Sequence, residues 1–86
     1  MPTICMFRGI KIYINWREHQ PPHFHAKYGG DEVVVSIQDL EAIEGGLPNK
    51  QLKMLLGWAA LHQEELFENW TLAEEQQELF PIAPLH

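Results

Sequence analysis

The chain has 86 residues and a mass of about 10.0 kDa, which leaves room for one small domain. Hydrophobic residues make up 45% and charged residues 21%, a balance that excludes wholesale disorder. No apolar run approaches the ~20 residues of a membrane-spanning helix, and residues 1–5 lack the pattern of a signal peptide. The single cysteine, Cys5, excludes an intrachain disulfide, so we expect a cytoplasmic protein in which Cys5 acts as a small hydrophobe.

The net charge of −6 is divided unevenly along the chain. Residues 1–30 carry a net charge of +3, and residues 31–86 carry −9. The overall acidity argues against a plain nucleic-acid binder, whereas the division predicts two surfaces with different roles.

The first predicted elements are strands. We expect a short strand over residues 3–7. Apolar and polar residues then alternate from Ile10 to Arg17, which predicts a half-buried strand. Pro21 and Pro22 cannot continue a strand ladder, so residues 17–22 are expected to form a loop.

A hairpin is predicted around Gly29-Gly30, because glycines suit tight turns between strands. A two-residue turn there pairs His23 with Ser36 at one end and Tyr28 with Asp31 at the other. One face of the hairpin is then apolar and consists of Phe24, Ala26, Val33 and Val35. The other face carries His23, His25, Lys27, Glu32, Val34 and Ser36.

Helical periodicity follows a short extended or turn segment over residues 40–44. Pro48 suits the first turn of a helix, and apolar residues recur at helical spacing as far as Trp70. We therefore predict one long helix over residues 48–69, broken near Trp70-Thr71. Thr71 and Glu74 match a capping box, which predicts a second short helix over residues 72–79.

These elements predict an α+β domain over residues 1–80, followed by a tail over residues 81–86. A small antiparallel sheet of three to four strands would pack on the long C-terminal helix. Such a sheet leaves its other face open to water, and that face presents the residues whose chemistry matters most.

One hypothesis for this face is a metal site. His23 and His25 stand two apart on a strand, so their side chains leave the same face. His19, four residues earlier, would be the third ligand of a transition metal such as zinc. Two features argue against a metal. No carboxylate follows the histidines closely, since the nearest ones are Asp31 and Glu32, and the basic residues nearby would repel a cation.

A second hypothesis is contact with RNA or DNA. Lys11, Arg17 and Lys27 would bind phosphates and Tyr13 would stack on a base. His19, His23 and His25 would then act as catalytic residues, since paired histidines beside cations can serve as general acid and base. The plain alternative is a solvated polar face without chemistry.

A third hypothesis is a protein partner. Met54, Trp58 and Leu61 fall on the side of the predicted helix away from its main apolar stripe. They would form a partner-binding surface, unless the second helix or the N-terminal segment covers them.

Several blocks of the sequence are familiar as a set. They are Met1-Pro2-Thr3-Ile4, the string from His19 to Gly29 with Pro-Pro-His-Phe-His-Ala, Gly46-Leu47-Pro48, Trp58-Ala59, and Glu65-Leu66 with Asn69-Trp70. Over residues 1–70 the chain resembles a family of short bacterial proteins, domain of unknown function 4160. The resemblance implies the toxin half of a toxin–antitoxin gene pair, with a small antitoxin-like protein as partner and His19, His23 and His25 as signature residues.

We therefore expect a toxin-like component that acts on RNA through its histidine face. The alternative is a metal-binding accessory or metalloenzyme domain that uses His19, His23 and His25, and a third option is a non-catalytic interaction module. The sequence leaves homo-oligomerisation open.

Overall fold

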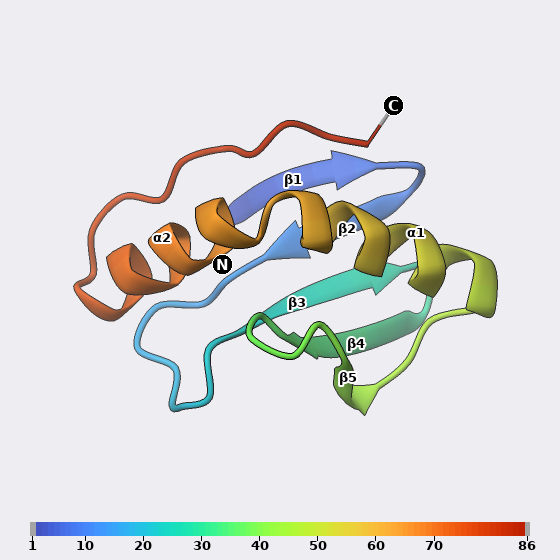
Figure 1. The fold of residues 1–86 in the computed structure, drawn as a ribbon, viewed down its shortest axis with the longest axis horizontal. Coiled ribbons are helices and arrows are strands. Elements are labelled where there is room, and N and C mark those ends of the chain that lie inside the picture. Colours follow the sequence, from blue (N-terminus) through green and yellow to red (C-terminus); the bar gives the residue numbers. More distant parts are fainter. Residues whose placement is uncertain (1, 86) are drawn as a thin grey trace.

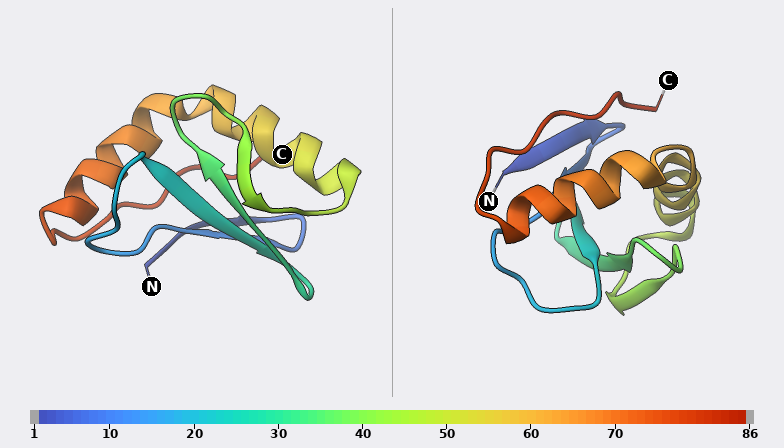
Figure 2. Two further views of the ribbon diagram at one scale, coloured as in Figure 1. Left: turned by 90° about the horizontal axis from the view of Figure 1, so that it is seen from below. Right: turned by 60° about the vertical axis from the view of Figure 1, so that its left-hand side comes forward.

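The computed structural model describes residues 2–85, which form an α+β fold with a helical layer on one face of a sheet (Figures 1 and 2). The elements in chain order are β1 (Thr3–Phe7), β2 (Ile10–Tyr13), β3 (His23–Tyr28), β4 (Asp31–Ser36), β5 (Ala42–Gly45), α1 (Asn49–Leu61) and α2 (Gln63–Glu74). The strands form one antiparallel sheet in the order β1-β2-β3-β4-β5. The fold class is as predicted, with five strands in place of three to four and two helices in place of one long helix.

The predicted hairpin register is confirmed. β3 and β4 pair from His23 with Ser36 to Tyr28 with Asp31. The apolar face of this hairpin is fully buried in the core, where it meets helical residues such as Leu55 and Leu66. Period-two alternation and a two-residue turn were sufficient for the prediction, because together they fix which side chains share a face.

β2 is shorter than its alternating pattern predicts. It ends at Tyr13, the last residue that pairs with β3. Ile14 remains buried, but Trp16 is 49% exposed, and its Nε1 donates a hydrogen bond to the backbone oxygen of Gln77. β3 continues to His23, but its pairing with β2 stops at Tyr13, and residues 14–22 form a loop beside the polar face.

The segment predicted as extended or turn over residues 40–44 forms the edge strand β5. It pairs with β4, with an irregularity in the register between Val34 and Val35. Gly45 has a positive φ of 69°, and the Gly46 amide donates to the backbone oxygen of Glu32. The sequence pattern did not identify this segment as a strand because it is only four residues long, and Gly45 ends it with a turn.

The prediction of an unbroken helix over residues 48–69 is wrong. The helices are separated at His62, and the chain changes direction there (Figure 2). Thr71 lies inside α2, so the capping box with Glu74 starts no helix, and the predicted second helix over residues 72–79 does not form. The bend allows Leu66 and Trp70 to reach the core after Trp58 and Ala59 have done so.

The C-terminal segment runs beside β1 (Figure 1). The amide of Ile82 donates to the oxygen of Ile4 at 2.8 Å, and the Ile82 side chain is only 4% exposed. The part of the predicted tail that the structure describes, residues 81–85, is therefore packed against the sheet.

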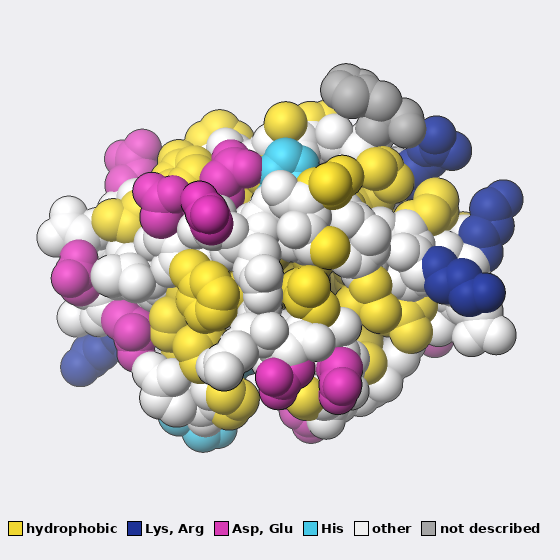
Figure 3. All heavy atoms as spheres, in the orientation of Figure 1, with side chains coloured by type: hydrophobic (Ala, Val, Ile, Leu, Met, Phe, Trp, Pro, Cys, Tyr) yellow, Lys and Arg dark blue, Asp and Glu magenta, His cyan; other side chains and the backbone are white. Residues whose placement is uncertain are grey.

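The helical face shows a division of charge (Figure 3). Acidic side chains gather mainly over the α2 end, and most of the visible Lys and Arg side chains lie at the end where α1 begins. Within residues 2–85, no helix is both long enough and apolar enough to cross a membrane.

Candidate metal centre

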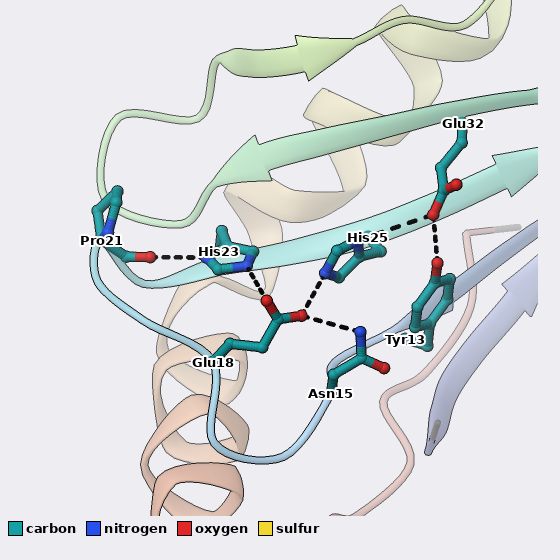
Figure 4. Close-up of polar contacts among 7 residues, drawn as sticks. All are labelled: Tyr13, Asn15, Glu18, Pro21, His23, His25 and Glu32. Atoms are coloured by element: carbon teal, nitrogen blue, oxygen red, sulfur yellow. Dashed lines mark hydrogen bonds and ion pairs between the residues drawn. The ribbon is translucent and has the colours of Figure 1, made fainter.

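The candidate site lies on the sheet face opposite the helices (Figure 4). His23 and His25 project from β3 on the same side, as their spacing predicts. Glu18 extends from the loop of residues 14–22 and places its carboxylate between the two rings (Figure 4).

Three ligand-type groups converge at this point. His25 Nε2 lies 2.6 Å from Glu18 Oε1, and His23 Nε2 lies 3.2 Å from Glu18 Oε2. One ligand atom from each of the three residues lies within 4.8 Å of the other two. Imidazole nitrogens and a carboxylate oxygen are the usual donors to divalent transition metals.

His23 is held rigidly and is 5% exposed. Its Nδ1 lies 2.7 Å from the backbone oxygen of Pro21. A carbonyl oxygen can only accept, so Nδ1 carries the proton and donates. The ring also packs against Trp70 of α2, with 5.0 Å between ring centroids. In the neutral ring, Nε2 therefore carries a lone pair that points at Glu18. This lone pair can bind either a metal cation or a proton.

His25 is stacked on Tyr13, its neighbour on β2, with ring centroids 4.9 Å apart and planes 10° apart. Its Nδ1 is buried and has no hydrogen-bond partner among the described residues. Glu32 Oε2 lies 3.8 Å from this nitrogen and accepts a hydrogen bond from the Tyr13 hydroxyl. His25 thus stands between two carboxylates, Glu18 and Glu32.

The carboxylate of Glu18 is held in its ionised form. Burial by itself would raise its pKa, but hydrogen bonds from His25, Asn15 and His23, together with the charge of His25, outweigh burial and lower the pKa below its ordinary value. The amide of Asn15 contributes at 2.9 Å. An ionised carboxylate at this position is what a metal ligand requires.

A cavity of about 170 Å³ opens beside the three groups, and Ile43 and Glu44 of β5 also line it. Val34 lies between His25 and Glu44 in the strand register, so it forms the floor. A neighbouring hollow of about 350 Å³ is bounded by Glu32 and Glu44. A larger hollow of about 410 Å³, at the bend between α1 and α2, lies away from this chemistry and is lined by glutamates and His62.

The structure places Glu18, and not His19, with the histidine pair. His19 is exposed, and its ring centroid is 6.3 Å from that of His23. The sequence pattern does not predict Glu18, because this residue lies in an irregular loop before the histidines, where no periodicity relates it to the strand. The one indication in the sequence was an acidic residue within the proline-containing loop that leads into β3.

The residues predicted to bind nucleic acid are only partly brought together. Lys11 and Lys27 face each other across β2 and β3, and Lys27 Nζ lies 5.6 Å from the centroid of the Tyr13 ring. Tyr13 itself is 3% exposed, so its ring is not available to stack on a base. Arg17 lies in the loop, where its backbone amide donates to Ala73 of α2.

The predicted partner surface is not a single exposed patch. Trp58 is 0% exposed, whereas Leu61 is 75% exposed and Met54 is half-buried against the core. The C-terminal segment covers Trp58, whose Nε1 donates to the oxygen of Ala83 at 2.8 Å. The expectation that Trp58 faces a partner is therefore wrong, because the chain itself occupies that position.

Most of the chain matches one known protein family. Residues 9–71 match the model described as domain of unknown function DUF4160. The chain belongs to this family. The match includes the loop and strand that carry Glu18, His23 and His25, so the candidate centre lies within the domain of unknown function 4160. No curated protein and no solved structure matches the chain.

Proposed function

We propose that this protein is a metal-binding domain in which Glu18, His23 and His25 hold a divalent transition metal such as zinc. The observation that carries the proposal is the convergence of these three groups, with the Nε2 atoms of both histidines directed at one carboxylate. This set takes the carboxylate from Glu18 in place of His19.

The hydrogen bond from His23 Nδ1 to Pro21 supports the proposal. Metal-ligating histidines almost always donate their other ring N–H to a carbonyl or carboxylate, which fixes the tautomer and the ring orientation. His23 has this arrangement, with Nε2 left free to bind. A bound cation would take the place of the hydrogen between His23 Nε2 and Glu18 Oε2.

Three protein ligands leave at least one coordination position for water or substrate, which is typical of catalytic rather than structural metal sites. Two histidines and one carboxylate are used both for catalytic zinc and for non-haem iron. The cavity beside the cluster gives that position access to solvent. A metal there would polarise a bound carbonyl or activate a water molecule.

The charge around the cavity favours this proposal over action on RNA. Glu18 and Glu44 line the cavity, and Glu32 lies behind His25. A phosphate backbone would meet these carboxylates before it reached the histidines. The arrangement therefore suits a cation with a neutral or cationic ligand better than a polyanion.

The test is metal titration of protein prepared without a His-tag and stripped with chelator. We expect the unmodified protein to bind one equivalent of Zn²⁺ or Co²⁺. Thermal and urea unfolding should show about 2.7 kcal/mol of stabilisation when free metal is about 100 times Kd. Glu18→Gln, His23→Ala and His25→Ala should lose this binding, and His19→Ala should bind as the unmodified protein does.

His19→Ala is the matched control, because it removes an exposed histidine from the same loop. Circular dichroism checks that each variant is folded. If Zn²⁺, Co²⁺ and Fe²⁺ all leave the unfolding midpoint unchanged, the three groups form only an ion-paired network and the proposal is wrong. Equal loss of binding in His19→Ala would also contradict the assigned ligands.

The toxin-like role and the antitoxin-like partner remain predictions from the resemblance. Induced expression in a bacterial host tests the role, with soluble protein matched between strains. We expect growth arrest from the unmodified protein and from His19→Ala, and normal growth with His23→Ala/His25→Ala. Normal growth in all three strains would contradict the toxin prediction and leave the metal centre to be judged by titration.

A further inference from the structure

We propose that Glu32 and Tyr13 position the metal ligand His25, with Glu32 accepting a hydrogen bond from His25 Nδ1 and Tyr13 holding Glu32 in place. This inference rests on the proposed metal centre and extends it to residues that do not touch the metal. It gives Glu32 and Tyr13 a shared role on the polar face of the sheet.

The first step concerns the free nitrogen of His25. Its Nδ1 is buried without a hydrogen-bond partner among residues 2–85, although the ring is fixed by stacking on Tyr13. An unpaired buried polar atom lowers the stability of the folded protein. Glu32 Oε2 is 3.8 Å from this nitrogen, and the Glu32 side chain is 46% exposed. A small rotation of the carboxylate about its bond to the Tyr13 hydroxyl would complete the bond to His25.

The second step concerns what Glu32 is tied to. The Tyr13 hydroxyl donates to Glu32 Oε2. The Tyr13 side chain is buried, and its hydroxyl carries the proton that makes this bond. Tyr13 and His25 are direct partners on β2 and β3, so one cross-strand pair sets both the ring stacking and the approach to Glu32.

The third step compares the two histidines. When Nε2 binds a metal, the proton of a neutral imidazole must be on Nδ1. His23 has an acceptor for that proton in Pro21, and Glu32 is the corresponding acceptor for His25. Loss of such an acceptor behind a metal ligand typically lowers metal affinity by about 10- to 100-fold.

The experiment measures Zn²⁺ affinity by competition with a chromophoric chelator, using the full chain. We expect Glu32→Ala to bind about 10- to 100-fold more weakly. Glu32→Gln should recover part of that loss, because its amide oxygen still accepts. Tyr13→Phe should have a smaller effect. Glu41→Ala is the control, since it removes one exposed acidic side chain from the segment before β5.

A second readout separates positioning from general stability. In the zinc-loaded protein, NMR should show a slowly exchanging Nδ1 proton on His25. That signal should be lost in Glu32→Ala and retained in Glu41→Ala. The Co²⁺ absorption spectrum should also change in Glu32→Ala, because the ligand ring is no longer held.

Two results would overturn the inference in distinguishable ways. If the unmodified protein binds zinc and Glu32→Ala binds it within about twofold, Glu32 does not position His25, and the proposed metal centre stands. If the unmodified protein binds no metal, the proposed function and this inference fail together.

Discussion

At the scale of single residues, Trp58 connects the sheet, the first helix and the C-terminal segment. Its ring lies 5.6 Å from that of Phe7 and 6.2 Å from that of Phe24 between centroids. Its Nε1 donates to Ala83. A fully buried indole that also satisfies its polar atom contributes strongly to the stability of a domain with so small a core.

We predict that Trp58→Ala lowers the free energy of unfolding by about 3–5 kcal/mol, because it leaves a large cavity and an unpaired carbonyl. Leu61→Ala, three residues later but exposed, should change it by no more than about 0.5 kcal/mol. Urea denaturation followed by circular dichroism measures both. Trp58→Phe serves where the alanine variant does not fold, and equal losses at the two positions would contradict the burial of Trp58.

At the scale of elements, the pairing of β5 with β4 forms the edge of the sheet that borders the candidate site. Gly45 adopts φ of 69°, and a Cβ there would stand 2.2 Å from the backbone oxygen of Glu32. That oxygen also accepts the amide of Gly46. Only glycine combines this conformation with so close an approach of two backbones.

Gly45→Ala should therefore destabilise the protein by about 1–3 kcal/mol or more, through strain and a clash that the backbone must relieve. Gly30→Ala is the control, because Gly30 has no positive φ and nothing within 4 Å of its Cβ position. It should be neutral or slightly stabilising, by up to about 1 kcal/mol. Thermal unfolding of the two variants compares them directly, and a tolerated Gly45→Ala would contradict the turn geometry.

At the scale of the whole molecule, the two edges of the sheet differ in exposure, because one is covered by another segment and the other is open to solvent. The C-terminal segment covers β1 through the bond from Ile82 to Ile4, and the amide and carbonyl of the Asn69 side chain hold Phe80. β5, at the other edge, is four residues long and exposed along its whole length. A short edge strand that carries charge resists pairing with other chains.

The C-terminal segment should therefore contribute measurably to stability. We predict that Ile82→Ala lowers the free energy of unfolding by about 2–5 kcal/mol, the usual cost of truncating a buried aliphatic side chain. Glu78→Ala, exposed in the same segment, should change it by no more than about 0.5 kcal/mol. If chemical denaturation gives the same midpoint for Ile82→Ala as for the unmodified protein, the segment is not packed against the sheet in solution.

The sequence predicted the histidine pair of the site but not its third member. His23 and His25 could be placed together because side chains alternate strictly along a strand. Glu18 and His19 are adjacent in a loop, where no such periodicity applies, and the path of the backbone alone decides which of them faces the strand. The predicted hairpin register places Glu32 on the same face as His25, but the contact of Glu32 with Tyr13 follows only from the pairing of β2 with β3.

The sequence by itself determined the α+β class, the β3–β4 register and the presence of two histidines on one polar face, because local periodicity and turn chemistry fix these features. Only the tertiary structure decided the bend at His62, the burial of Trp58 under the C-terminal segment, and the approach of Glu18 to the histidines. Each of these depends on contacts between segments far apart in the chain or on the path of an irregular loop. Their energies arise from packing and desolvation in the folded molecule, so no local pattern in the sequence encodes them.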